Sequence, residues 1–416
     1  MPRDIAWRRP MQQRDVHEDH RASTPLELLV DLSFVVGISQ VATSLHHALS
    51  EGHVGVAVLA YPTTFFSIWW AWVNFTWFAS SYDTDDVPFR LATLLQIAGV
   101  LVIAAGVPRA FNDHDFKIST VGYLITRIGL ISQWWRVSRN RESRVTARRY
   151  AIGLAICQAG WFLLLLFPTP VRSWGFLVLV LAELSVPIIA ERDTPTSWHP
   201  GHIAERYGLF TLIVLGESIL AATVAVQEGI DAGKHVADLI LISVGGLLVV
   251  FCMWWMYFDH DAEAMFEEAI GDDGDTARAH RIAFEWGYGH FVVFGSAAAV
   301  GAGLSVAVDH VLDAGEGGLA GNHGELSDLG VGFAVTIPIA MFVIAMFVLH
   351  RKSRHIRSPR GWALPVTALA VLATSFTGEP VLFSGLLLAA VQTVAIVNGW
   401  TRIGRASADA EVGIAG

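Results

Sequence analysis

The sequence predicts an all-α fold: a polytopic bundle of about twelve transmembrane helices, arranged as two parallel six-helix repeats. Only 16% of the 416 residues are charged and 53% are hydrophobic, whereas soluble proteins carry about 25% charged residues. Apolar runs close to the ~20 residues that a spanning helix needs recur along the whole chain. Two sets of these runs also carry polar residues in the same order.

The expected spans follow the apolar runs. In chain order they are residues 26–49, 54–80, 91–111, 119–137, 147–167, 174–190, 204–227, 236–258, 283–308, 331–350, 361–377 and 381–400. The eleventh is the weakest, because the segment Thr377–Pro380 cuts one long apolar run in two. The alternating strands of about ten residues that indicate an outer-membrane barrel do not occur in the sequence.

The polar ends flank two expected repeats. Residues 1–24 are Arg-rich and lack the apolar core of a secretory signal, so we expect a largely disordered cytoplasmic leader. Residues 402–416 predict a similar cytoplasmic tail. Between them, residues 25–191 form the first expected transmembrane repeat and residues 192–401 the second.

Basic residues alternate between the loops. The loops 139–149 and 351–360 carry five Lys or Arg residues each, whereas the loop 309–330 carries none. By the positive-inside rule this asymmetry predicts that both termini are cytoplasmic, and an even number of spans agrees with that orientation. Topology explains these basic loops better than nucleic-acid or lipid recognition does, and we expect no nucleic-acid partner.

The first and seventh spans share a pattern. ELLVDLSFVVGISQVATSL (27–45) and ERYGLFTLIVLGESILAATVA (205–225) both begin with Glu and carry a Gly followed by polar residues. The second and eighth spans each place a Trp pair before Asn74 or Asp259 and an acidic loop. Six helices per unit would insert both copies in the same orientation. Such duplication is typical of secondary transporters, whose substrate site lies between the halves.

Four segments carry a resemblance to a known family. TPLELLVDLSFVVGISQVA, WVNFTWFASSYDTDD, RLATLLQIAGVLVIAAGVPRAF and ERYGLFTLIVLGESILA resemble the bacterial low temperature requirement A family, and the likeness extends over residues 24–400. The resemblance implies a multi-pass protein of the bacterial cell (inner) membrane. It implies no established reaction, substrate or cofactor, so no catalytic residue is carried over and no cofactor is expected.

Polar residues inside the expected spans gather toward the predicted cytoplasmic side. Charged groups are costly in the bilayer and are retained where they pair, face a cavity or act in function. Glu27 and Asp31 stand four residues apart and therefore share a helix face. We predict a polar cavity open to the cytoplasm, lined by spans one to three and seven to nine; the candidates are Glu27, Asp31, Asn74, Arg90, Gln96, Arg127, Glu205, Arg206, Glu217, Asp259, Glu285 and His290.

Glu217 lies in the middle of the seventh span. It follows Arg206 by eleven residues on the same helix face, about 16 Å away, which is too far for a direct pair. Arg127 of the fourth span is therefore a candidate partner; alternatively Glu217 is held protonated and carries protons. The simpler interpretation is an interhelical hydrogen bond.

A metal site is weakly indicated. His202, Glu205, Asp259 and His290 are ligand types suited to zinc, manganese or iron, but no HExxH motif accompanies them. Capping and salt-bridge roles at helix ends explain them better, so we expect no metal. Most of the fifteen Trp residues fit interfacial belts, with Trp72 and Trp255 as candidates to line the cavity.

Three functions remain open. The first is a transporter that couples protons or another cation to a small solute, through Glu217 and the Glu27/Asp31 pair. The second is an intramembrane enzyme acting on a lipid or lipid-linked substrate, through Glu205, Asp259 and His290. The third is a membrane scaffold or sensor without catalysis. The duplication and the mid-membrane acid favour the transporter, with the lipid bilayer and a small solute or lipid as partners.

Overall fold

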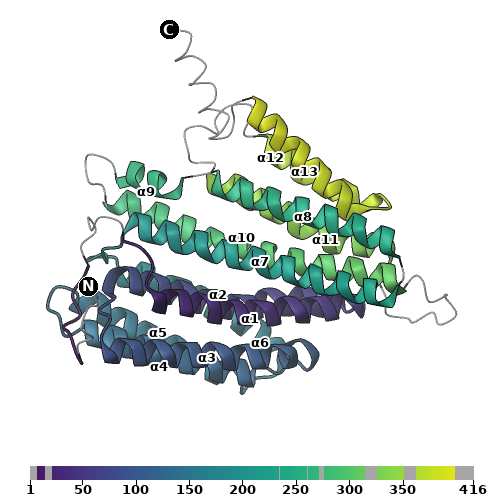
Figure 1. Cartoon of the computed structure of the whole chain (residues 1–416). Helices are drawn as coiled ribbons and strands as arrows, with labels where there is room; N and C mark the ends of the chain where they lie inside the picture. The colour runs from purple at the N-terminus through teal and green to yellow at the C-terminus, as the bar shows by residue number, and fades with distance from the viewer. Residues whose placement is uncertain are drawn as a thin grey trace, which may run out of the picture. The chain divides into compact units, whose positions relative to one another are not determined.

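Helices form the whole regular structure of the described chain. The computed structural model describes residues 7–14, 21–233, 235–259, 261–270, 276–313, 326–350 and 362–398. Within these residues the elements are α-helices with one short 3-10 turn and no strand, which confirms the all-α prediction (Figure 1).

The helices follow the predicted spans in order. They are α1 (Pro25–Ser50), α2 (Val54–Tyr82), α3 (Val87–Asn112), α4 (Lys117–Val137), α5 (Arg144–Leu164), α6 (Thr169–Ala190), α7 (Pro200–Ala232), α8 (Val236–Phe258), α9 (Ala262–Ile270), α10 (Thr276–Asp313), α11 (Asp328–His350), α12 (Ala363–Ala373) and α13 (Pro380–Val397). The short α9 is additional to the prediction. The weak eleventh span is the 11-residue α12, which a 3-10 turn at Thr374–Phe376 ends before Pro380 opens α13.

Eight helices within the described residues are long and apolar enough to cross a membrane. They are α1, α2, α3, α6, α8, α10, α11 and α13. A chain with this many spanning helices is a multi-pass membrane protein.

The chain divides into two compact units. Unit 1 comprises Met1–Val41 and Pro62–Tyr207, and unit 2 comprises Ala42–Tyr61 and Gly208–Gly416. The divisions fall inside α1, α2 and α7, and not at the predicted repeat boundary near residue 191. The six-helix repeat therefore remains a prediction.

In unit 1, α3 to α6 pack in sequence, each against the next (Figure 1). The α3–α4 contact brings the backbones together at Gly122, where an added Cβ would lie 2.5 Å from the Ile103 nitrogen. Small residues are the usual means by which membrane helices approach closely. Around this layer an aromatic core includes Phe78, Tyr82 and Trp134.

In unit 2, the main pairs are α10 with α11 and α8 with α13. α7 joins α10 where the Ser218 hydroxyl donates to the Ala297 carbonyl at 2.9 Å. An added Cβ at Gly301 of α10 would lie 2.9 Å from the Ser218 Cα, so these helices also meet closely. Ser218 thus lies at a close contact between α7 and α10.

The described parts of the leader, residues 7–14 and 21–24, are ordered and pack against the rest of unit 1, whereas the expectation of disorder for residues 1–6 and 15–20 lies outside the described residues. Met11 is buried in the aromatic core beside Tyr82. The Arg14 nitrogen donates to the Ser81 carbonyl at 3.0 Å. Arg21 is buried and donates to the carbonyls of Ala79, at 2.7 Å, and Ser80. The guanidinium thereby binds two carbonyls in the last turn of α2, of which that of Ala79 also accepts from the Asp83 nitrogen at 3.2 Å.

Candidate functional site

The site begins at the N-terminus of α1. Thr24 and Glu27 form a capping box, in which the Thr24 nitrogen donates to Glu27 Oε2 at 2.7 Å and the Glu27 nitrogen donates to Thr24 Oγ1 at 3.3 Å. Pro25 occupies the first helical position, where its missing N–H is no loss. The cap uses one oxygen of Glu27 and leaves Oε1 available to α7.

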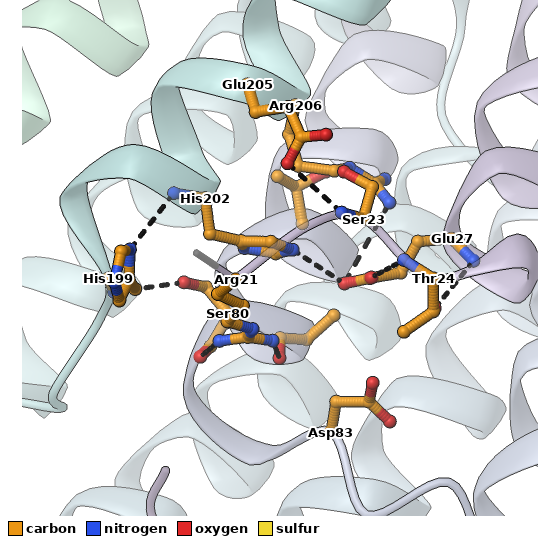
Figure 2. A network of polar contacts seen from close by, with 12 residues as sticks. Arg21, Ser23, Thr24, Glu27, Ser80, Asp83, His199, His202, Glu205 and Arg206 are labelled. Carbon is orange, nitrogen blue, oxygen red and sulfur yellow. Dashed lines mark hydrogen bonds and ion pairs between the residues drawn. The ribbon is translucent and has the colours of Figure 1, made fainter. Parts of the chain in front are cut away.

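The start of α7 supplies the other half of the site. His202 and Arg206 stand four residues apart and share a helix face, as Glu27 and Asp31 do on α1. Figure 2 shows His202 and Arg206 facing Glu27. His202 Nε2 lies 3.1 Å from Glu27 Oε1, and Arg206 Nη2 lies 2.6 Å from Asp31 Oδ1. Arg206 Nη1 lies 3.9 Å from Glu27 Oε1, so Arg206 contacts both acids.

α2 closes the third side of the site. The Trp72 indole nitrogen donates to Asp31 Oδ1 at 2.7 Å, and Arg206 Nη2 donates to Thr76 Oγ1 at 3.4 Å. The Phe75 ring lies 5.8 Å from the Arg206 guanidinium carbon, within cation–π range. Trp72, which the sequence suggested as a cavity-lining residue, therefore contacts a candidate acid directly.

The four charged or titratable side chains of this buried cluster, Glu27, Asp31, His202 and Arg206, are all 0% exposed. Their hydrogen bonding is incomplete: Glu27 Oε1, Asp31 Oδ2, both His202 ring nitrogens, and Arg206 Nε and Nη1 have no hydrogen-bond partner. Burying a polar atom without a partner costs about 1–3 kcal/mol, and more for a charge. Such a cluster is a poor way to stabilise a fold, which makes it the candidate functional site.

An acidic group outside the spans lies beside the cluster. The Asp83 side chain, just after α2, is 3% exposed and lies 3.7 Å from Arg14 of the leader. The pKa of Asp83 is raised to about 6: burial is the largest cause, the negative charge of Glu27 also raises it, and the Arg14 charge offsets part of the rise. Asp83 therefore changes charge close to neutral pH. At the same edge, the Ser23 nitrogen donates to Glu205 Oε2 at 3.0 Å.

Arg127 belongs to a different buried pair. Its Nη2 lies 2.9 Å from Glu183 Oε2 on α6, so Arg127 is not the partner of Glu217, contrary to one alternative from the sequence. Glu183 also accepts hydrogen bonds from the Trp70 and Trp161 indoles and from the Tyr123 hydroxyl, at 3.0–3.2 Å. Arg127 therefore has its anionic partner, Glu183, within unit 1.

The remaining candidates of the first half bond elsewhere in unit 1. The Asn74 amide donates to the Trp70 carbonyl of its own helix at 2.7 Å. Arg90 pairs with Asp85 at 2.8 Å, and Gln96 donates to Gln133 of α4 at 3.0 Å. The structure therefore places Glu27, Asp31 and Arg206 in one cluster and leaves these three out of it.

The candidates of the second half lie in unit 2. Glu217 is half-buried on α7, Glu285 is exposed on α10, and the Asp259 nitrogen caps α8 by donating to the Trp255 carbonyl at 2.9 Å. His290 is buried, with Nε2 3.0 Å from the Tyr257 hydroxyl and Nδ1 2.7 Å from the Trp286 carbonyl. Among the residues that the structure describes, no group of three or more His, Cys, Asp or Glu could hold a metal ion.

Residues 22–397 match the family described as bacterial low temperature requirement A protein. The chain belongs to this family. An uncharacterized protein of Rhizobium meliloti (strain 1021) is 29% identical over 308 residues, which cover 69% of this chain and 70% of that protein. No solved structure matches the chain significantly. The resemblance given by the four sequence segments is thus confirmed, and low temperature requirement A membership agrees with a multi-pass membrane protein.

One member of the buried cluster in this low temperature requirement A protein, His202, lacked a clear signal in the sequence. His202 stood out only as a weak metal candidate, and its contact with Glu27 spans 175 residues of chain, counted from His202 to Glu27. The Thr24–Glu27 capping box is a local signal that fixes where Glu27 sits, and it could have been recognised from the spacing alone.

Proposed function

We propose that the protein is a carrier in the bacterial inner membrane that couples the movement of a small solute to a proton or another cation. The buried cluster is the observation that supports this most. Within the cluster itself, two carboxylates and one guanidinium, with His202 neutral, carry one net negative charge, and the buried Arg21 guanidinium of the leader lies beside it (Figure 2). A site of this kind gains from taking up one positive charge.

The location of the cluster fits a carrier. Its members come from α1, α2 and α7, and the proposed repeat pairs the first of these with the third. If the repeat holds, the cluster lies where secondary transporters place substrate and ion sites. The basic loops support cytoplasmic termini, which would put the leader and the cluster toward the cytoplasm. In the structure the site is closed, and the proposed cavity requires a second conformation.

The enzyme alternative has less support. It needs Glu205, Asp259 and His290 as reacting groups, and the Asp259 backbone is part of the cap of α8. Both ring nitrogens of His290 also have partners, which leaves no free base at that position. No specific observation favours the scaffold alternative.

The test is a flux assay in proteoliposomes. Purified protein is reconstituted with a pH-sensitive dye inside, and amino acids, sugars, organic acids, polyamines and organic cations are added outside in turn. We expect one class of solute to enter the wild-type proteoliposomes in a way that depends on protons or sodium. The same solute should not enter proteoliposomes that contain Asp31→Asn. The matched control is Glu142→Gln, an exposed acid in the α4–α5 loop. Absence of flux above empty liposomes with every class would refute the carrier.

A further inference from the structure

We infer that the coupling ion is a single proton and that His202, held against Glu27, is the group that carries it. This inference rests on the proposed function for its role in coupling. The existence of the proton site stands on the geometry of the buried cluster. A proton and a metal cation would both balance its one negative charge, so the ligand atoms must distinguish them.

The ligand atoms disfavour a metal cation. Sodium sites in carriers use backbone carbonyls released where helices unwind, but α1 and α7 run as unbroken helices through the cluster. Only Glu27 Oε1 and Asp31 Oδ2 remain as free carboxylate oxygens. Arg206 lies between these acids, 2.6 Å from Asp31 and 3.9 Å from Glu27. Its permanent charge would repel a second cation there.

His202 accepts the charge without needing new ligands. Histidine is the side chain whose ordinary charge change falls near neutral pH. Its Nε2 already lies 3.1 Å from Glu27 Oε1, so adding one proton creates a charge-assisted hydrogen bond in place of an unsatisfied contact. The Nδ1 atom has no hydrogen-bond partner and is free to pass the proton on.

The charged groups around His202 come from three segments. Glu27 of α1 is in direct contact, Arg206 and Glu205 come from its own helix, and Arg21 comes from the leader (Figure 2). Burial of the ring is the largest effect and disfavours its charged form, and Arg206 and Arg21 also oppose the added proton. The Glu27 carboxylate is the group that attracts the proton and offsets part of these costs. Arg206 pairs most closely with Asp31, at 2.6 Å.

Asp83 is placed to deliver the proton. It lies at the end of α2, outside the spans, and is close enough to feel the charge of Glu27. In the transfer, the Asp83 carboxylic acid loses one proton and a His202 ring nitrogen gains it, so the net charge of the pair is unchanged. Buried water would have to bridge the two groups.

The first experiment follows histidine protonation in the full-length protein. The protein is labelled with ¹⁵N-histidine, placed in lipid nanodiscs and titrated from pH 5 to pH 8 by NMR. Among the signals of the 16 histidines, we expect one that changes with pH and that is absent from His202→Gln. The same signal should remain in His53→Gln, the control, whose substituted side chain is exposed. In Glu27→Gln the same histidine should bind its proton about tenfold more weakly, because its carboxylate partner is neutral. No titrating signal assignable to His202 would overturn the inference.

A second measurement needs no variant to fold. Thermal stability of the wild type is compared in sodium, potassium, lithium and choline chloride at equal ionic strength and constant pH. A ligand that binds only the folded state raises its stability, so we expect the four salts to give the same value. Stabilisation of the wild type by one of the metal cations over choline would overturn the proton assignment and leave the carrier intact. A titrating His202 without solute flux in the earlier assay would refute the carrier and leave the proton site.

Discussion

Two buried glutamates show how surroundings decide the role of a residue. The Glu183 carboxylate accepts four hydrogen bonds, from Trp70, Tyr123, Arg127 and Trp161. One carboxylate oxygen of Glu27 accepts the hydrogen bond of the helix cap, and the other has no hydrogen bond. A buried pair whose acid accepts this many hydrogen bonds holds helices together, whereas an under-satisfied acid can change its protonation or partners at low cost. We therefore assign Glu183 to structure and Glu27 to function.

Glu183→Gln should unfold readily. The substitution leaves the Arg127 charge buried without its partner, and breaking such a pair costs about 3–5 kcal/mol. Replacing both residues by Met should recover much of the loss, because no buried charge then remains. The free energy of unfolding is measured with denaturant for the wild type, Glu183→Gln, Glu183→Met, Arg127→Met and the double Met variant. Equal losses in the single and double variants would contradict the assignment.

The titration of Asp83 should make the stability of the fold decrease as the pH rises. Burial first, and then the Glu27 charge, raise its pKa from 3.8 to about 6, so the folded state binds this proton more tightly than the unfolded state. The resulting stabilisation is complete below about pH 4 and is lost as pH rises through about 6, a change of ~3 kcal/mol. Asp83→Asn should remove this slope and should be the more stable protein at pH 7.5.

Unfolding temperatures of wild type and Asp83→Asn between pH 4 and pH 8 check this prediction. The exposed Asp113, replaced in the same way, serves as the control because no comparable burial acts on it. Identical pH profiles in wild type and Asp83→Asn would show that Asp83 does not titrate in this range.

At the scale of single residues, the sequence located the acids but not their partners. Glu27 and Asp31 follow from a four-residue spacing on one apolar helix, which is local information. Their contacts with His202 and Arg206 join positions far apart in the chain, and no spacing rule encodes such a contact.

The α1 capping box is an element whose loss can be measured. Thr24→Ala removes the hydroxyl that accepts from the Glu27 nitrogen and should cost about 1 kcal/mol of stability. It should also loosen Glu27 and weaken any His202 proton binding. Ser33→Ala, which removes a hydroxyl bonded within α1 to the Leu29 carbonyl, is the matched control. A change in stability of the same size in both variants would show that the cap has no special role.

The α3–α4 contact predicts a glycine that cannot be replaced. Ala at position 122 would place a Cβ 2.5 Å from the Ile103 nitrogen and 2.7 Å from the Gly99 carbonyl oxygen, both backbone atoms. Overpacking of this kind costs about 1–3 kcal/mol. Gly216→Ala on α7 meets open space and should be neutral or slightly stabilising. Unfolding temperatures that rank the two variants the other way would contradict this packing.

Element positions were the most predictable part of the molecule. Twelve apolar runs anticipated twelve helices because span length follows from bilayer thickness. The short α9 was missed because nine polar-flanked residues give no spanning signal, and α12 is short because the Thr377–Pro380 segment stops it.

At the scale of the whole molecule, the sequence pattern and the packing divide the chain differently. The repeat was predicted from motifs shared by residues 27–45 and 205–225. The packing units instead exchange residues 42–61 and begin the second unit at residue 208. These are different properties: a repeat is a relation between two chain segments, whereas a unit is a group of mutual contacts.

Orientation is the whole-molecule prediction on which the direction of proton entry depends. In a background lacking Cys157 and Cys252, which are buried, single cysteines are introduced at Gln12 in the leader and at Asn322 in the loop 309–330. The excess of Lys and Arg on the leader side predicts that this side faces the cytoplasm. A membrane-impermeant maleimide added to intact spheroplasts should therefore label Asn322→Cys at once and Gln12→Cys only after permeabilisation. The reverse order would place Asp83 and the buried cluster toward the outside, and protons would then reach His202 from the opposite compartment.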